Sequence, residues 1–135
     1  MPYLDSNVFI YPVLYNLESE PKAQKAQDIL FSVEAGELEA YTSTLTWDEV
    51  VWVVSKTMGR SEAVNVGKKL LGFPNLKLID VDALVVCSAQ RLIEKNKINP
   101  RDAIHVACAL EKKITDIISD DSELDVIKEI HRIPL

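Results

Sequence analysis

Short apolar segments alternate with longer helical segments along the whole chain, in an order that few folds accommodate. The order is one strand, two helices, one strand, two helices, one strand, two helices and then two strands. Strands that alternate with helices of this length imply right-handed crossovers, so the pattern predicts an α/β fold whose mostly parallel sheet is covered on both faces. The predicted strands span about residues 2–4, 38–42, 76–81, 117–119 and 130–135; the predicted helices span about 6–15, 21–35, 43–59, 60–71, 82–96 and 99–114, with one helical turn at 124–127. Pro12 is expected to kink or end the first helix, because its ring removes a backbone hydrogen bond.

The length and composition predict one domain, residues 1–135, with a full hydrophobic core, since 47% of the residues are hydrophobic. No apolar stretch approaches the ~20 residues that a bilayer crossing requires. The N-terminus has no basic segment followed by an apolar one, so we expect no secretory signal, no membrane contact and a cytoplasmic location. Cys87 and Cys108 lie in apolar helical segments and are expected to be buried, reduced thiols.

The charge of the chain limits its partners. Fifteen Lys and Arg against 21 Asp and Glu give a net charge of −6 at pH 7. This balance argues against a protein that binds nucleic acid passively through a basic surface. It does not exclude an enzyme that attracts phosphate through bound metal, because cations invert the local charge of an acidic site.

Four acidic residues stand at the junctions between predicted strands and helices: Asp5, Glu49, Asp102 and Asp121. In parallel α/β sheets ligands bind outside the carboxyl ends of the strands, so these side chains are expected to converge there. Hard divalent cations such as Mg²⁺ prefer oxygen ligands. A metal held in this way can activate water and orient an attack on phosphorus, so the pattern predicts phosphodiester hydrolysis.

Each of these positions also has a purely structural interpretation. An Asp after a strand can cap the next helix, and an acidic residue in a first helical turn is favoured by the helix dipole. Asp48 is an alternative to Glu49, and only one of two adjacent helical residues is expected to face the site. His105 lies on roughly the same helix face as Asp102, and we expect it to be packed or capped rather than in contact with substrate.

The segments around the four carboxylates resemble the PIN-domain family, particularly the single-domain VapC-type toxins of toxin–antitoxin modules. The similar segments are Tyr3–Ile10, Thr42–Val50, Asn99–Ala109 and Ile118–Asp125, and their order and spacing extend the resemblance over essentially the whole chain. The resemblance implies an α/β/α sandwich and an endoribonuclease dependent on Mg²⁺, with Mn²⁺ possible. It also implies an RNA substrate, a homodimer and silencing by an antitoxin protein.

Carried over by position, the resemblance implies that Asp5, Glu49, Asp102 and Asp121 form the acidic, metal-holding site. Asn7 and Ser119 resemble polar residues that support such a site through hydrogen bonds. The last segment departs from the family pattern, because Asp120 and Asp121 stand together and Glu123 occupies a place where the family often has Asp. The spacing after Ser119 favours Asp121, with Asp120 and Glu123 in supporting places.

Two rival functions fit parts of the pattern. A PIN-fold scaffold or binding module would keep the fold without activity, and the intact carboxylates argue against it. A phosphoaspartate phosphatase would need a second Asp two residues after Asp5, where the chain has Asn7.

Further candidate contacts lie outside the carboxylates. The aromatic and apolar residues Trp47, Trp52, Tyr11, Leu14 and Tyr15 could form a contact patch, with one Trp in the core and the other exposed. The cationic residues Lys56, Arg60, Arg101, Lys112 and Lys113 are candidates for contacts with an RNA backbone, although solvated surface is their default interpretation.

Overall fold

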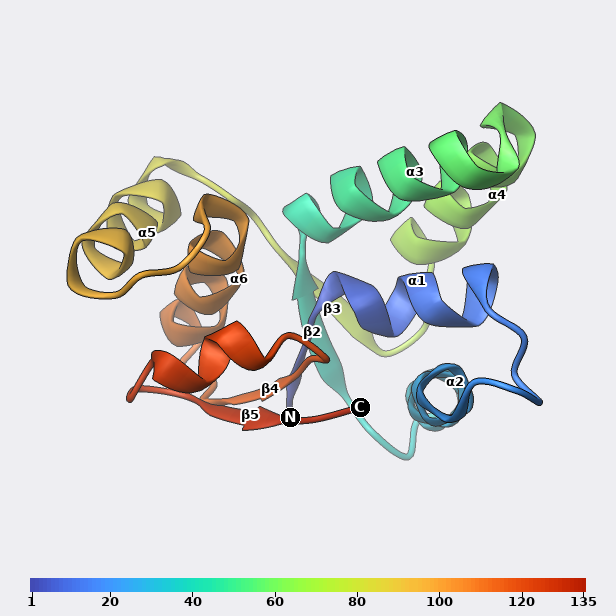
Figure 1. The fold of residues 1–135 in the computed structure, drawn as a ribbon, viewed down its shortest axis with the longest axis horizontal. Coiled ribbons are helices and arrows are strands. Elements are labelled where there is room, and N and C mark those ends of the chain that lie inside the picture. The colour runs from blue at the N-terminus through green and yellow to red at the C-terminus, as the bar shows by residue number, and fades with distance from the viewer.

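The computed structural model describes residues 1–135 and contains six α-helices, one 3₁₀ helix and five strands (Figure 1). The strands are β1 (Tyr3–Leu4), β2 (Ala40–Ser43), β3 (Leu76–Ile79), β4 (Asp116–Ile118) and β5 (His131–Ile133). The helices are α1 (Ser6–Leu14), α2 (Pro21–Glu34), α3 (Thr44–Met58), α4 (Arg60–Leu71), α5 (Ala83–Lys95), α6 (Pro100–Glu111) and the 3₁₀ helix η1 (Ser122–Val126).

The five strands form one sheet in the order β3-β2-β1-β4-β5, and every neighbouring pair is parallel. The shortest strand, β1, lies at the centre, where Tyr3 is in register with Tyr41 of β2 and with Ile117 of β4. All five carboxyl ends therefore point to the same edge of the sheet. The predicted α/β class is confirmed, and the sheet is wholly rather than mostly parallel.

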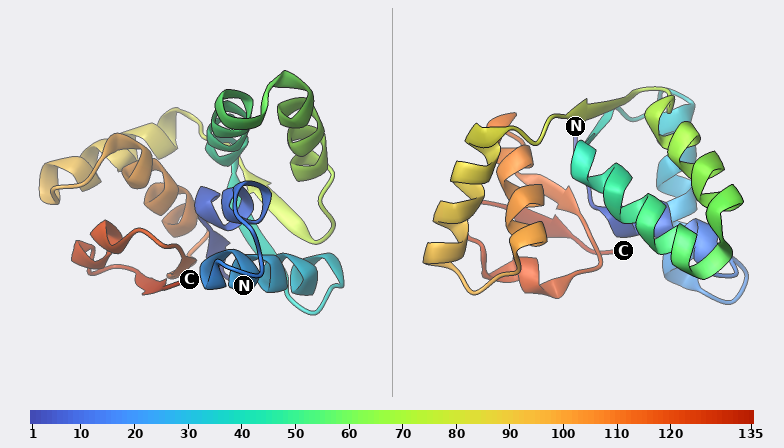
Figure 2. Two further views of the ribbon diagram at one scale, coloured as in Figure 1. Left: turned by 45° about the vertical axis from the view of Figure 1, so that its right-hand side comes forward. Right: turned by 90° about the horizontal axis from the view of Figure 1, so that it is seen from above.

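Helices cover both faces of this sheet and make a three-layer α/β/α sandwich, as Figures 1 and 2 show. Helices α5 and α6 pack together on one face, whereas α1 to α4 form the layer on the other. The central strand shows why both layers are needed, since Tyr3 is buried in the cluster with α5 and α6 and Leu4 in the cluster with α1 to α4. A strand buried on both faces is typical of parallel sheets.

Some local predictions were wrong in detail. Of the two effects expected of Pro12, it does not end α1 at its own position, since the helix continues for two more residues to Leu14. Strand β2 begins at Ala40 rather than residue 38, and β3 ends at Ile79 rather than residue 81. Cys108 is buried as expected, but Cys87 is exposed on α5.

No helix in the structure combines the length and the apolar character that a membrane crossing requires. This agrees with the absence of long apolar stretches in the sequence.

Candidate functional site

Asp5 directly follows the central strand and is almost completely buried, with 4% of its surface exposed. Its carboxylate accepts hydrogen bonds from the Ser6 backbone N–H at 2.7 Å, from the Ser119 hydroxyl at 2.5 Å and from the Asn7 amide at 3.4 Å. The bond from Ser6 caps α1, so the capping role that the sequence allows is real. The remaining two bonds hold the carboxylate in one orientation at the edge of the sheet.

Ser119 and Asn7 join the ends of β1 and β4. The Ser119 hydroxyl donates to Asp5 and accepts from the Asp121 backbone N–H at 3.0 Å and from the Asn7 amide at 3.4 Å. The Asn7 side-chain oxygen accepts from the Asp120 backbone N–H at 3.4 Å. These contacts position the loop after β4 relative to Asp5, which is the kind of support that the sequence predicts for Asn7 and Ser119.

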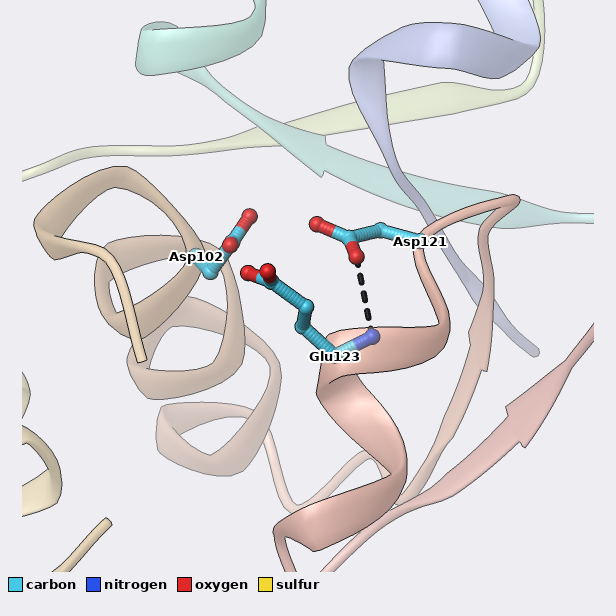
Figure 3. A group of neighbouring side chains, drawn as sticks. All are labelled: Asp102, Asp121 and Glu123. Atoms are coloured by element: carbon cyan, nitrogen blue, oxygen red, sulfur yellow. Dashed lines mark hydrogen bonds between the residues drawn. The ribbon is translucent and has the colours of Figure 1, made fainter. Parts of the chain in front are cut away.

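Three carboxylates lie close together beside this network (Figure 3). Asp102 comes from the first turn of α6, and Asp121 and Glu123 come from the start of η1. One ligand oxygen from each lies within 4.8 Å of the others, a spacing at which the three could hold a single metal ion. Asp121 also caps η1, because it accepts the Glu123 backbone N–H at 2.9 Å.

The negative charges of these carboxylates interact unfavourably with one another. Burial and, after it, the negative charges of Asp121 and Asp5 together raise the pKa of Asp102 from 3.8 to about 7. A hydrogen bond to Asp121 also favours the protonated form of Asp102. The carboxylates therefore repel one another near neutral pH, and either a proton or a cation would relieve the repulsion.

Glu49 belongs to the same depression of the surface. It lines an open hollow of about 530 Å³ together with Asp102 and Asp121, and the other lining residues are Asn99, Pro100 and Arg101. Asp48, its neighbour on α3, is exposed and lines a smaller adjoining hollow. The structure thus brings Glu49 to the carboxylates and leaves Asp48 at their margin.

His105 is the residue whose place the sequence did not predict. It is buried, as expected, with 1% of its surface exposed, but it is packed inside the acidic site. Its Nε2 atom is hydrogen-bonded to Glu49 and lies 3.4 Å from Asp5 Oδ1, while Nδ1 lies 2.7 Å from the Tyr3 hydroxyl. Its helical spacing from Asp102 was the available signal; the contacts with Tyr3 and Glu49 bridge distant parts of the chain.

The charge of His105 is set by two opposing effects. Burial lowers its pKa, but the hydrogen bond to Glu49 and the negative charges of Asp5, Glu49 and Asp102 outweigh burial, so the net shift is upward. The Tyr3 hydroxyl in turn donates to Ser43 at 2.9 Å. A protonated His105 can therefore donate to Tyr3 through Nδ1 and to Glu49 through Nε2, and it balances part of the acidic charge.

Asp120 points to a different part of the molecule from Asp121. Its carboxylate accepts from the Tyr11 hydroxyl at 2.6 Å and from the Lys22 ammonium at 2.7 Å. Burial acts to raise the pKa of Asp120, but the hydrogen bonds from Lys22 and Tyr11 lower it overall. Asp120 thus ties the loop after β4 to α1 and α2, whereas Asp121 faces Asp102.

The arrangement matches a known family. The family model of the PIN domain matches residues 3–130, which is nearly the whole chain. The chain belongs to the PIN domain family. A comparison with curated protein sequences finds no match.

Solved structures share the same PIN fold at low sequence identity. VapC20 from Mycobacterium tuberculosis, described as a sarcin–ricin loop cleaving toxin, has a TM-score of 0.74 and 14% identity over 93% of this chain and 94% of that one. VapBC2 from Rickettsia felis, bound to a promoter DNA fragment, has a TM-score of 0.71 and 15% identity over 99% and 98%. A toxin–antitoxin complex from Klebsiella pneumoniae has a TM-score of 0.69 and 16% identity over 97% and 96%. At these identities the likeness establishes the fold of this PIN domain.

Proposed function

We propose that this protein is a metal-dependent endoribonuclease that hydrolyses RNA phosphodiester bonds, as the toxin of a toxin–antitoxin pair. The observation that carries the proposal is the convergence of carboxylates at the carboxyl edge of a parallel sheet, where burial and the charges of Asp121 and Asp5 raise the pKa of Asp102 to about 7. PIN domains typically bind divalent metals, and the matched structures include toxin–antitoxin complexes and a toxin that cleaves the sarcin–ricin loop.

The donor set fits a hard divalent cation. Asp5, Glu49, Asp102 and Asp121 are the proposed catalytic and metal-holding residues, and the proximity of Glu123 to Asp102 and Asp121 adds a further oxygen. Carboxylate oxygens suit Mg²⁺ or Mn²⁺ better than ions that select sulfur. When bound, such an ion would supply positive charge at the scissile phosphate and increase the acidity of a nearby water.

The residues around that ion have different roles. Asp5 is held by hydrogen bonds from Ser6, Asn7 and Ser119, so it offers an oriented oxygen beside His105. His105 holds Glu49 and contributes positive charge, while Ser119 and Asn7 fix the loop that carries Asp121. Held carboxylates reduce the reorganisation that metal and phosphate binding would otherwise require. An antitoxin partner, a homodimeric assembly and a cytoplasmic location belong to the same proposal.

The test is cleavage of a mixed pool of structured and single-stranded RNA by the purified protein in Mg²⁺, Mn²⁺ or EDTA. Asp5→Asn and Asp102→Asn are compared with Asp80→Asn, which changes an exposed carboxylate outside the hollow. We expect metal-dependent cleavage that Asp80→Asn retains and the other two variants lose. Equal cleavage by all four proteins would refute the site, and neither metal binding nor cleavage by the wild type would indicate a non-catalytic PIN-fold module.

A further inference from the structure

One face of α3 leads away from the carboxylates and carries an unusual set of side chains. Asp48, Trp52 and Lys56 follow one another at intervals of four residues, so they form a single stripe along the helix. Trp52 is 55% exposed, and the Lys56 Nζ atom lies 4.2 Å from the centre of its ring. The stripe therefore presents a large aromatic surface beside a cation.

This stripe is continuous with the acidic site. A small hollow beside Trp52 is lined by Asp48, Glu49, Val53 and Arg101, and it shares Glu49 and Arg101 with the larger hollow that Asp102 and Asp121 line. Arg101 thus stands between the carboxylates and the aromatic ring. A molecule that lies in the larger hollow could continue past Arg101 onto Trp52 without leaving the surface.

The second tryptophan of α3, Trp47, lies in a different environment from Trp52. Trp47 on the same helix is 40% exposed, and its ring packs beside Gly67 of α4, where an added Cβ atom would lie 3.1 Å from Nε1. The sequence predicts one tryptophan in the core and the other exposed, but both are exposed, and Trp47 packs beside α4.

The chemistry of the stripe selects its ligand. In a chain whose net charge is −6, two cationic side chains flank this aromatic ring at the edge of the acidic site. Alternating negative charge and flat aromatic surface are the features of a single-stranded nucleic acid, in which phosphates pair with cations and bases stack on aromatic rings. The exposed ring of Trp52 with Lys56 and Arg101 beside it complements RNA in both respects, although Asp48 and Glu49 line the same small hollow.

We infer that Trp52 is a base-stacking subsite for single-stranded RNA, in which Arg101 and Lys56 contact the flanking phosphates next to the scissile bond. This inference rests on the proposed nuclease function and specifies how the substrate lies: its strand runs from the carboxylates along α3. A stacked base contributes about 1–3 kcal/mol, so loss of the ring should weaken RNA binding by about 5-fold to 150-fold.

The two tryptophans allow a direct test, because the chain contains no others. Trp47→Phe leaves Trp52 as the single indole fluorophore, and Trp52→Phe leaves Trp47. Each protein is titrated with short single-stranded oligoribonucleotides of mixed sequence in Mg²⁺, with Asp102→Asn added in a parallel set so that cleavage cannot alter the signal. We expect the RNA to quench the fluorescence of Trp52 and to leave that of Trp47 nearly unchanged.

The affinity is measured in the same series with Trp52→Ala, Arg101→Ala and Lys56→Ala, and Lys68→Ala serves as a matched cation on the exposed surface of α4. Trp52→Ala should lower affinity within the range given above, Arg101→Ala and Lys56→Ala should reduce the salt dependence of binding, and Lys68→Ala should do neither. Oligonucleotides with a single abasic position should lose the quenching when that position reaches Trp52. Circular dichroism confirms that each variant is folded.

The outcomes separate this inference from the proposed function. If the wild type cleaves RNA but Trp52 fluorescence and the affinity of Trp52→Ala are unchanged, the subsite is refuted and the nuclease remains. If sedimentation shows that Trp52→Ala dissociates a dimer without altering RNA affinity, the stripe is a contact between two copies of the chain and the inference is wrong. If the wild type neither binds nor cleaves any RNA, the proposed function fails and the subsite fails with it.

Discussion

Replacing Asp102 with Asn should make the metal-free protein more stable at alkaline pH. In the folded protein, burial and the charges of Asp121 and Asp5 raise the pKa of Asp102 from 3.8 to about 7. Between these two values the folded state binds a proton that the unfolded state has released, so stability falls as pH rises. The stabilisation is complete below the unfolded value and is lost once pH passes about 7. Asn resembles the protonated carboxyl group and removes this dependence.

The expected change in the free energy of unfolding depends on how much of the interval between the unfolded and folded pKa values of Asp102 lies within the pH range of the experiment. Each pH unit corresponds to about 1.4 kcal/mol, so the interval from about pH 5.5 to the folded value contributes at most about 2 kcal/mol. Asp102 is only half-buried, and solvent screening reduces the expected effect to about 1 kcal/mol. For a chain of this length that is a difference in Tm of about 3–4 °C.

The assay is thermal and urea unfolding in EDTA at about pH 5.5 and pH 8, for the wild type, Asp102→Asn and the exposed control Asp80→Asn. His105, whose raised pKa also reduces stability as pH rises, is present in all three proteins; because the charge of Asp102 contributes to that raised pKa, the difference between variants includes the coupling of Asp102 to His105. Between the two pH values, the free energy of unfolding of Asp102→Asn should rise by about 1 kcal/mol relative to that of the wild type. Saturating Mg²⁺, at about 100 times its Kd, should stabilise the wild type by about 2.7 kcal/mol and Asp102→Asn by much less. A difference between the two proteins that is the same at both pH values would refute the reasoning.

Three further predictions concern the side chains around the site and the packing of α3 against α4. His105→Phe should lower the free energy of unfolding by about 2–4 kcal/mol in urea titrations, because it removes buried hydrogen bonds to Tyr3 and the acidic site, and His105→Gln should restore part of the loss. Asp120→Asn should cost only about 0.5–1 kcal/mol by the same measurement and leave calorimetric metal affinity unchanged, whereas Asp121→Asn should weaken metal binding. Gly67→Val should destabilise the α3–α4 pair by about 1–3 kcal/mol in thermal unfolding, because its added carbon atoms crowd neighbouring side chains on α3; an unchanged Tm would contradict this.

The architecture was predictable because it depends on local patterns. Apolar strands of two to four residues alternate with helices, and this alternation predicts the parallel sheet and the edge at which Asp5 and Asp121 lie. The boundaries were less predictable, since pairing with neighbouring strands decides where a strand ends. Pro12 lies near the end of α1, which stops two residues after it.

The details of the site depend on contacts between residues far apart in the sequence. His105 meets Tyr3 and Glu49, and Asp120 meets Lys22, only after the layers have packed. Sequence spacing indicates that His105 shares a helix face with Asp102, but it does not indicate what lies opposite that face. For the same reason the exposure of Cys87 was mispredicted, because the width of the buried stripe on α5 is set by the neighbouring α6.

The carboxylates of the site differ in how the fold holds them. Because of this difference, a bound cation should mainly change the protonation of Asp102. Asp5 accepts hydrogen bonds from Ser6, Asn7 and Ser119, so its position is fixed by contacts with α1 and with the segment after β4. Asp102 is half-buried and faces Asp121 and Asp5, and burial together with these charges raises its pKa to about 7. A bound cation would remove the repulsion that raises this pKa, and Asp102 would release its proton. Metal affinity should therefore rise with pH up to about 7 in the wild type, and that dependence should be weaker when residue 102 is Asn.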